Sequence, residues 1–277
     1  MTEPRGSELL VSTEWLAANL EGAGRDFVLI DAGEAVAYRR VHIPGAVGVP
    51  HPYLKSDDDP AYVMSAAAFE ALAGGLGISN EMPVIVYDES ASLHSARVWW
   101  VFNHFGHTNV RVVDGGFNAW LEEGRALTSI APRPARASFV AQEAPATACS
   151  LDELKATVEA GSGAQIWDLR ADGEWTGADL RGNTRGGHVP GAQHLVWRQL
   201  VQGPPMRRFR PLDEIEAQLR AAGIDPTAPT VTYCELGIRA AFGNFVLRLL
   251  GNDASRTYDG SMNEWANRLD TPLVTEV

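Results

Sequence analysis

One segment of the chain reads Thr230-Val231-Thr232-Tyr233-Cys234-Glu235-Leu236-Gly237-Ile238-Arg239-Ala240-Ala241-Phe242. Its first four residues are β-branched or aromatic, which favours a strand that ends at the cysteine. A short loop with one glycine follows, and the residues from Arg239 to Leu250 have the apolar spacing of an amphipathic helix. This order predicts a strand, a loop and a helix, with Cys234 in the loop.

A thiol at this position faces the unpaired N–H groups with which the helix begins. These groups and the positive end of the helix dipole favour the thiolate. A free cysteine has a pKa near about 8.5, and such positions bring it to about 3.5–7.5, so Cys234 is a candidate nucleophile. The alternative is that Cys234 is a small buried apolar residue, as free cysteines often are.

Strands and helices alternate along the whole chain. Apolar runs of strand length are separated by segments of helical periodicity, and two of these runs end in a carboxylate, at Asp31 and Asp168. The alternation predicts an α/β fold with mainly parallel sheets flanked by helices. The predicted strands cover residues 27–31, 84–88, 110–113, 165–168 and 231–233.

Landmarks of the first half recur in the second half at nearly constant spacing. The turn at His42 returns 146 residues later at His188, and the landmark at Asp114 returns 145 residues later at Asp259. Cys234 lies 146 residues after Asp88. Such constant offsets indicate a tandem duplication in which only the second copy has a cysteine at this loop.

The duplication predicts the domain boundaries. The first domain covers residues 1–129 and lacks the nucleophile, and the second covers residues 148–277 and is the catalytic one. The segment between them, residues 130–147, is rich in Pro and Ala and is predicted to be a linker.

Composition and charge exclude several classes of function. With 277 residues, 45% of them hydrophobic, and a formal charge of -12, the chain is a globular protein with no large basic surface for nucleic acid or an anionic membrane. The two cysteines, Cys149 and Cys234, form no disulfide framework and no zinc motif. Residues 1–6 lack an apolar signal core, so we expect a cytoplasmic protein.

The chain resembles the rhodanese family of tandem-domain sulfurtransferases, which includes the thiosulfate and 3-mercaptopyruvate sulfurtransferases. The motifs that carry the resemblance occur in both halves. They are His42-Ile43-Pro44-Gly45-Ala46, Ser95-Ala96-Arg97-Val98-Trp99-Trp100, Asp114-Gly115-Gly116-Phe117-Asn118-Ala119-Trp120, Gly187-His188-Val189-Pro190-Gly191-Ala192 and Tyr233-Cys234.

The resemblance implies two rhodanese-like domains, the first inactive, and an active site near their interface. Cys234 would take a sulfane sulfur from thiosulfate, or from 3-mercaptopyruvate as second choice, and hold it as a persulfide. The acceptor would be cyanide, a small thiol or a thioredoxin-like protein, and neither a cofactor nor a metal is required. The persulfide would lie in the loop formed by Cys234, Glu235, Leu236, Gly237, Ile238 and Arg239.

The resemblance also suggests which charged residues surround the sulfur. Arg239 would stabilise the thiolate and the sulfonate of thiosulfate, whereas Glu235 opposes both unless it points outward. Arg170 matches a family arginine near the donor site. Arg185 is a further candidate for donor binding, although it could equally belong to a solvated basic face. Cys149 has no predicted role.

Two other functions stay open at this stage. Some phosphatases of related fold use a Cys-x5-Arg loop, but the spacing from Cys234 to Arg239 is Cys-x4-Arg, which suits one sulfur better than a phosphate. A non-catalytic rhodanese-like module that binds a protein or a small anion is the second alternative, and Glu235 is the residue that favours it.

Overall fold

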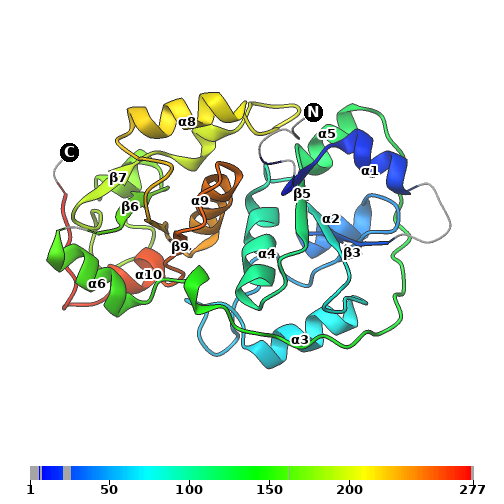
Figure 1. Ribbon diagram of the computed structural model, residues 1–277, viewed down its shortest axis with the longest axis horizontal. Coiled ribbons are helices and arrows are strands. Elements are labelled where there is room, and N and C mark those ends of the chain that lie inside the picture. Colours follow the sequence, from blue (N-terminus) through cyan, green and yellow to red (C-terminus); the bar gives the residue numbers. More distant parts are fainter. Residues whose placement is uncertain (1–5, 7, 21–25, 162, 276–277) are drawn as a thin grey trace. The chain divides into compact units, whose positions relative to one another are not determined.

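The computed structural model describes residues 6, 8–20, 26–161 and 163–275. The opening residues 1–5, where the sequence predicts no signal core, lie outside this part. In the described part, every helix is too short or too polar to cross a membrane. The chain folds into two units (Figure 1).

Each unit includes a short segment from the other half of the chain. Unit 1 consists of Met1–Leu54, Met64–Ala144 and Val201–Phe209, and unit 2 of Lys55–Val63, Pro145–Leu200 and Arg210–Val277. The predicted boundaries 1–129 and 148–277 therefore miss two exchanged segments, because neither carries a strand or helix pattern of its own.

The predicted linker is mostly part of unit 1. The N–H of Ala137 donates to the carbonyl of Gly74 at 3.0 Å, and that of Ala144 donates to the carbonyl of His104 at 2.8 Å. Residues 130–144 thus pack along unit 1, and the division between the units comes at Pro145. The Pro/Ala composition predicted the irregular backbone, but not these contacts.

Unit 1 contains a five-stranded sheet with the order β1-β5-β4-β2-β3, and all its pairs are parallel. Its core on one face joins the sheet to α1 and α5 through Leu16, Leu29, Ile85 and Trp120. The strands are β1 Leu10–Val11, β2 Val28–Asp31, β3 Val47–Gly48, β4 Val84–Tyr87 and β5 Val110–Val113, and the helices are α1 Thr13–Leu20, α2 Ala35–Arg40, α3 Ala66–Gly75, α4 Leu93–His104 and α5 Gly116–Glu122.

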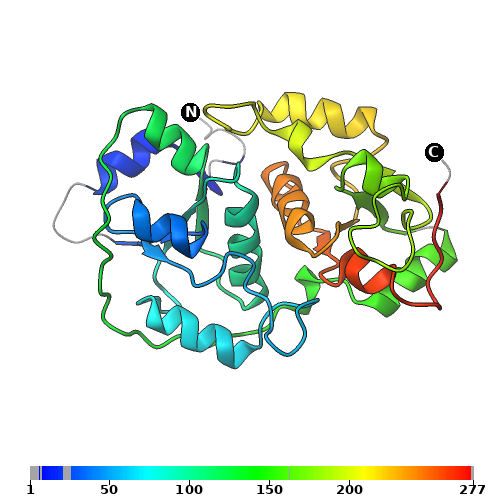
Figure 2. The ribbon, with the colours of Figure 1, turned by 180° about the vertical axis from the view of Figure 1, so that it is seen from behind.

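Unit 2 repeats this plan with a four-stranded parallel sheet in the order β7-β6-β8-β9. One face packs on α6 and α10 through Leu154, Tyr233, Met262 and Trp265, and Figure 2 shows α9 in orange and α10 in red. The strands are β6 Gln165–Asp168, β7 Ala192–His194, β8 Thr230–Tyr233 and β9 Ser255–Thr257, and the helices are η1 Pro145–Thr147, α6 Leu151–Ala160, α7 Asp172–Trp175, η2 Trp197–Leu200, α8 Leu212–Ala221, α9 Ile238–Leu249 and α10 Ser261–Trp265.

The duplication extends to individual hydrogen bonds. The hydroxyl of Tyr87 donates to Asp31 at 2.6 Å, and the hydroxyl of Tyr233 donates to Asp168 at the same distance. Each tyrosine also accepts an N–H from the His-x-Pro-Gly turn of its own unit, at 3.0 and 3.1 Å. The strand-end carboxylates therefore hold these turns in place, and the predicted α/β fold with two similar domains is confirmed.

Candidate functional site

The loop after β8 brings Cys234 to the N-terminus of α9. Gly237, which precedes the helix, has φ +79° and occupies the left-handed region that favours glycine. The N–H of Cys234 donates to Oγ of Ser261 at 3.1 Å, and its carbonyl accepts the N–H of Met262 at 3.1 Å. The start of α10 thus fixes the backbone at the cysteine, a role for Ser261 that sequence reasoning missed.

The sulfur of Cys234 is buried. Only 1% of the residue is exposed, and the Oγ of Ser261 lies 4.0 Å from the sulfur. Leu236, two residues further along the loop, is 38% exposed. Leu236 is therefore the part of this loop that solvent reaches, two residues from the buried cysteine.

The backbone amides that follow Cys234 are available for an anion. In the described part of the chain, the N–H groups of Glu235, Leu236, Gly237 and Ile238 donate no hydrogen bond to the backbone. Unpaired N–H groups at the start of a helix form a ready site for negative charge. The loop after Cys234 therefore has backbone donors beside the cysteine that make no hydrogen bond to the backbone of the described residues.

The equivalent loop of unit 1 contains its own anion. The carboxylate of Asp88 accepts the N–H groups of Ser90 at 2.6 Å, Ser92 at 3.1 Å and Ser95 at 2.6 Å. The carbonyl of Asp88 accepts the N–H of Phe117 at 2.8 Å, just as the carbonyl of Cys234 accepts an N–H from α10. In unit 1 this loop therefore binds a negative group attached to its first residue.

Arg239 is paired with a carboxylate of its own unit. Its two terminal nitrogens bind both oxygens of Glu174 at 2.7 and 2.8 Å, and the side chains are 17% and 5% exposed. Burial alone would lower the pKa of Arg239, but the bond to Glu174 and the charge of the Cys234 thiolate raise it. Arg239 thus carries its charge near the sulfur while it is paired with Glu174, and its stabilisation of the thiolate and of a donor sulfonate stays a prediction.

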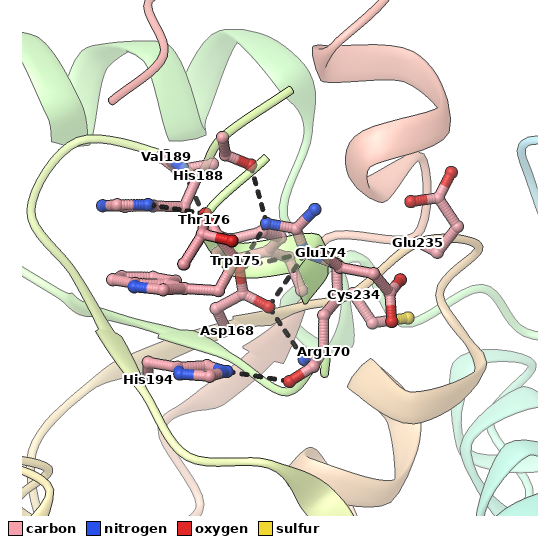
Figure 3. Close-up of polar contacts among 12 residues, drawn as sticks. Asp168, Arg170, Glu174, Trp175, Thr176, His188, Val189, His194, Cys234 and Glu235 are labelled. Carbon is pink, nitrogen blue, oxygen red and sulfur yellow. Dashed lines mark hydrogen bonds and ion pairs between the residues drawn. The ribbon is translucent and has the colours of Figure 1, made fainter. Parts of the chain in front are cut away.

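Arg170 is also paired. Its guanidinium binds Asp168 at 2.7 to 3.0 Å and the carbonyl of Gly187 at 2.9 Å, and 2% of the residue is exposed. Figure 3 shows this pair at the end of β6, with Cys234 and Glu235. The charge of Arg170 is therefore already compensated by Asp168.

Arg185 has a structural role. Its guanidinium donates to backbone carbonyls near the end of unit 2, and to a hydroxyl. The acceptors are the carbonyls of Trp265, Ala266, Arg268 and Thr271, and the Oγ1 of Thr271. These contacts use the guanidinium to hold the segment after α10, and donor binding by Arg185 stays an untested prediction.

Glu235 points into the protein. Only 7% of the residue is exposed, its Oε1 accepts the amide of Asn183 at 2.8 Å, and its Oε2 is buried without a partner in the described part of the chain. Burial raises the pKa of Glu235, and Asn183 and Arg170 partly offset this. The side chain of Glu235 therefore does not point outward, which was the condition under which it would not oppose an anion.

A stack of three rings lies behind the site. Trp175 is sandwiched between His188 and His194, with ring centroids 3.3 and 4.7 Å apart (Figure 3). The Nε2 of His194 lies 2.8 Å from the carbonyl of Arg170, and Trp175 is the residue after Glu174 in α7. The stack therefore contacts the segments that carry Arg170 and Glu174. Of its three residues, the sequence analysis marked only His188, as part of a turn.

The described residues contain no candidate metal cluster, and the second cysteine is buried. Among the described residues, no group of three His, Cys, Asp or Glu side chains is arranged to hold a metal ion. Cys149 is 3% exposed, and burial raises its pKa to about 12. Its thiol is therefore neutral at physiological pH and does not compete as a nucleophile.

A known family model matches both halves of the chain. The family model described as "Rhodanese-like domain" matches residues 12–123 and again residues 150–268. The chain belongs to the rhodanese-like family. The second rhodanese-like region contains the Cys234 loop, and the first contains the Asp88 loop.

Rhodanese-like relatives align over nearly the full chain. A thiosulfate sulfurtransferase of Corynebacterium glutamicum is 33% identical over 97% of this chain and 91% of its own length. The sulfur carrier protein TtuD of Thermus thermophilus is 32% identical over 96% of both chains. The thiosulfate sulfurtransferase of Bos taurus is 32% identical over 94% of this chain and 92% of its own.

Solved structures share the fold of the whole chain. Wild-type EanB matches all of this chain and 71% of its own with a TM-score of 0.88 and 22% identity. An anaerobic ergothioneine biosynthesis enzyme from Chlorobium limicola matches with a TM-score of 0.87 and 21% identity, over 100% of this chain and 72% of its own.

Proposed function

We propose that this chain is a sulfurtransferase that holds a sulfane sulfur on Cys234 as a persulfide. The observation that carries the proposal is the Asp88 carboxylate, which binds three loop amides from the position equivalent to Cys234. In a persulfide the two sulfurs follow Cβ just as the carboxyl carbon and oxygen do in aspartate. The outer sulfur would thus extend toward the loop amides from Cys234 as the carboxylate does from Asp88.

Two loop amides near Cys234 correspond to amides that bind Asp88, and both are available to bind the outer sulfur. Leu236 corresponds to Ser90 and Ile238 to Ser92, and neither N–H has an acceptor in the described part of the chain. The third position, Ala241, donates to the carbonyl of Gly237 at 3.0 Å instead. Two amides and the helix dipole are therefore available to stabilise the negative sulfur.

The proposed reaction has two steps. The Cys234 thiolate attacks the outer sulfur of thiosulfate, a new S–S bond forms, the old S–S bond breaks, and sulfite leaves with its electron pair. The persulfide then gives its outer sulfur to cyanide, forming thiocyanate, or to a thiolate, forming a new persulfide, and the Cys234 thiolate returns. Thiosulfate is the donor named for several relatives, and 3-mercaptopyruvate is our second choice.

The cellular setting follows from the same chemistry. A lone reactive thiol is stable in a reducing cytoplasm, which we propose as its location. The donor is a small sulfur compound, and the acceptor is cyanide, a small thiol or a thioredoxin-like protein. The free cysteines, both buried, are consistent with that compartment.

Intact mass spectrometry tests the proposal. After incubation with thiosulfate, the wild-type chain should gain one sulfur, which cyanide removes. Cys234→Ser should gain none, and Cys149→Ser should behave as wild type because its thiol is buried and neutral. Sulfur on Cys149, or an unchanged mass with both thiosulfate and 3-mercaptopyruvate, would contradict the proposal.

The burial of Cys234 favours one other function, a rhodanese-like module that binds a partner without chemistry. The same experiment separates the two, because a binding module acquires no sulfur from either donor. Turnover of an aryl phosphate that is lost in Cys234→Ser would instead support the phosphatase alternative.

A further inference from the structure

The charges around Cys234 add up to an unusual site for a dianion. Arg170 and Arg239 supply two positive charges, and each is compensated by its own carboxylate, Asp168 and Glu174. Glu235 adds a third carboxylate, which forms no ion pair with any of the described residues. With Glu235 ionised, these five groups sum to a charge of -1 before the thiolate is counted. Arg181, whose side chain is 55% exposed and whose Nε lies 3.9 Å from Oε1 of Glu174, adds one positive charge that solvent screens.

Glu235 is built into the loop rather than left at the surface. Its backbone carbonyl accepts the N–H of Asn263 at 3.0 Å, and its Oε1 accepts the amide of Asn183. The oxygen of Asn183 in turn accepts the amide of Asn267 at 2.8 Å. These neutral amides fix the side chain of the residue that follows Cys234, and its buried Oε2 has no partner among the residues that the structure describes.

We propose that Glu235 determines which sulfur donors this site accepts, by disfavouring dianionic donors when it is ionised and tolerating them when it is protonated. The proposal rests on the sulfurtransferase function proposed above. The preferred donors are then sulfane compounds with at most one negative charge, such as organic thiosulfonates or low-molecular-weight persulfides. Thiosulfate, a dianion, would be a good donor only at lower pH.

The direction of the pH dependence follows from the groups that face Glu235. Burial raises the pKa of its carboxyl, Arg170 and Arg239 pull it down, and Glu174 pushes it up. Below that raised pKa the Glu235 carboxyl group is neutral. Above it the Glu235 carboxylate repels each additional negative charge on the donor. Ionisation of the Cys234 thiol acts on all donors alike, so it cancels when two donors are compared.

Thiosulfate and methanethiosulfonate form a matched pair of probes, because both present a terminal sulfane sulfur on an oxidised sulfur but differ by one charge. The quantity to measure is the ratio of kcat/KM for thiosulfate to kcat/KM for methanethiosulfonate from pH 5 to 9. In the wild type we expect this ratio to fall by about tenfold or more as Glu235 ionises. Glu235→Gln should keep the ratio high and flat.

Three further variants make the test specific. Glu235→Asp retains the charge and should retain the pH-dependent fall. Asn183→Ala removes the hydrogen bond that lowers the pKa of Glu235, so the fall should move to higher pH. Glu89→Gln changes the equivalent residue of unit 1, 146 positions earlier, and should leave the ratio as in wild type.

The outcomes separate this inference from the function on which it rests. A ratio that does not vary with pH in the wild type, or that varies equally in Glu235→Gln, overturns the role of Glu235. Should Glu235→Gln fail to fold, the wild-type profile and the shift in Asn183→Ala still decide the matter. Absence of sulfur transfer from both donors in every variant refutes the sulfurtransferase proposal instead.

Discussion

At the scale of single residues, the site is defined by how its charges are paired. The sequence marked Arg239 as the cation for the thiolate, but the fold brings Glu174 against it from α7. The pKa of Glu174 is lowered, since Arg239 outweighs the effect of burial. Arg239 therefore stabilises the loop as part of a buried ion pair as well as through its charge near the sulfur.

This pairing predicts an asymmetric response to mutation. Arg239→Met removes the cation that binds both oxygens of the buried Glu174 carboxylate and leaves it only the longer contact to the half-exposed Arg181, at 3.9 Å. The change should cost about 3 kcal/mol of the free energy of unfolding. The double variant Arg239→Met/Glu174→Met should recover much of this loss, because no unpaired charge remains buried. Urea denaturation of the single and double variants measures both effects.

The exposed pair of Arg220 and Glu216 on α8 is the matched control. Its nitrogen–oxygen distance is 3.0 Å, and its side chains are 50% and 28% exposed. Breaking this pair should cost only about 0.3–0.5 kcal/mol. Equal losses in the two pairs would contradict the importance assigned to the Arg239 pair.

At the scale of elements, the turn between β8 and α9 depends on Gly237. The equivalent position in unit 1 is Ala91, which also has positive φ, at +60°. At Gly237, however, an added Cβ would lie 2.7 Å from the carbonyl oxygen of Asp259, which real contacts do not allow. The second unit therefore needs glycine here both for the backbone conformation and for the close approach of Asp259.

Gly237→Ala should consequently distort the persulfide loop. Gly223, after α8, provides the control: its φ is also +79°, but an added Cβ would meet only Gln193, at 3.7 Å. Gly223→Ala should cost about 1–2 kcal/mol for the left-handed conformation alone. Gly237→Ala should cost clearly more and should abolish persulfide formation, as thermal unfolding and intact mass would reveal. Equal effects of the two substitutions would refute the contact argument.

At the scale of the whole molecule, each unit is completed by a segment from the other half of the chain. Lys55, from the first half, binds Asp259 of unit 2 at 2.9 Å, and Tyr62 donates to Glu264 at 2.5 Å. Arg208, from the second half, binds Glu123 of unit 1 at 2.6 Å. Cutting the chain between the sequence-defined domains would remove these contacts, so neither half is a complete folding unit.

The stability of the molecule should also depend on the strand-end carboxylate of unit 1. Burial raises the pKa of Asp31 to about 6 from 3.8, whereas its counterpart Asp168 is paired with Arg170. The unfolded chain loses the Asp31 proton first as pH rises, so this group lowers stability progressively between about pH 4 and pH 6. A difference of about 2 pKa units corresponds to about 3 kcal/mol.

Asp31→Asn removes this titration. The free energy of unfolding of Asp31→Asn, minus that of the wild type, should therefore increase by up to about 3 kcal/mol from pH 4 to pH 7. Urea denaturation at the two pH values, followed by tryptophan fluorescence, measures the difference. A difference that stays constant across this range would show that Asp31 does not titrate as its burial implies.

Much of the fold could be predicted from local patterns. The runs 84–88 and 231–233 are apolar and β-branched, and they form β4 and β8, because strand formation in a buried sheet depends on those local properties. The repeat of landmarks at constant offsets predicted two similar units, now matched by family models over both regions. The exchanged segments 55–63 and 201–209 were missed because they form neither helix nor strand and are held by distant partners.

The chain's own sequence determined the two α/β units, the loop with Cys234 and the presence of Asp88 in place of a cysteine in the first copy, since these depend on short-range periodicity and residue type. Tertiary structure decided how the charges are used. Glu174, Asn183 and Ser261 come from segments far from Cys234 in sequence, and only folding brings them to the loop. Coulomb interactions and burial act through space, so the pairing of Arg239 and the inward position of Glu235 could not be obtained from spacing along the chain.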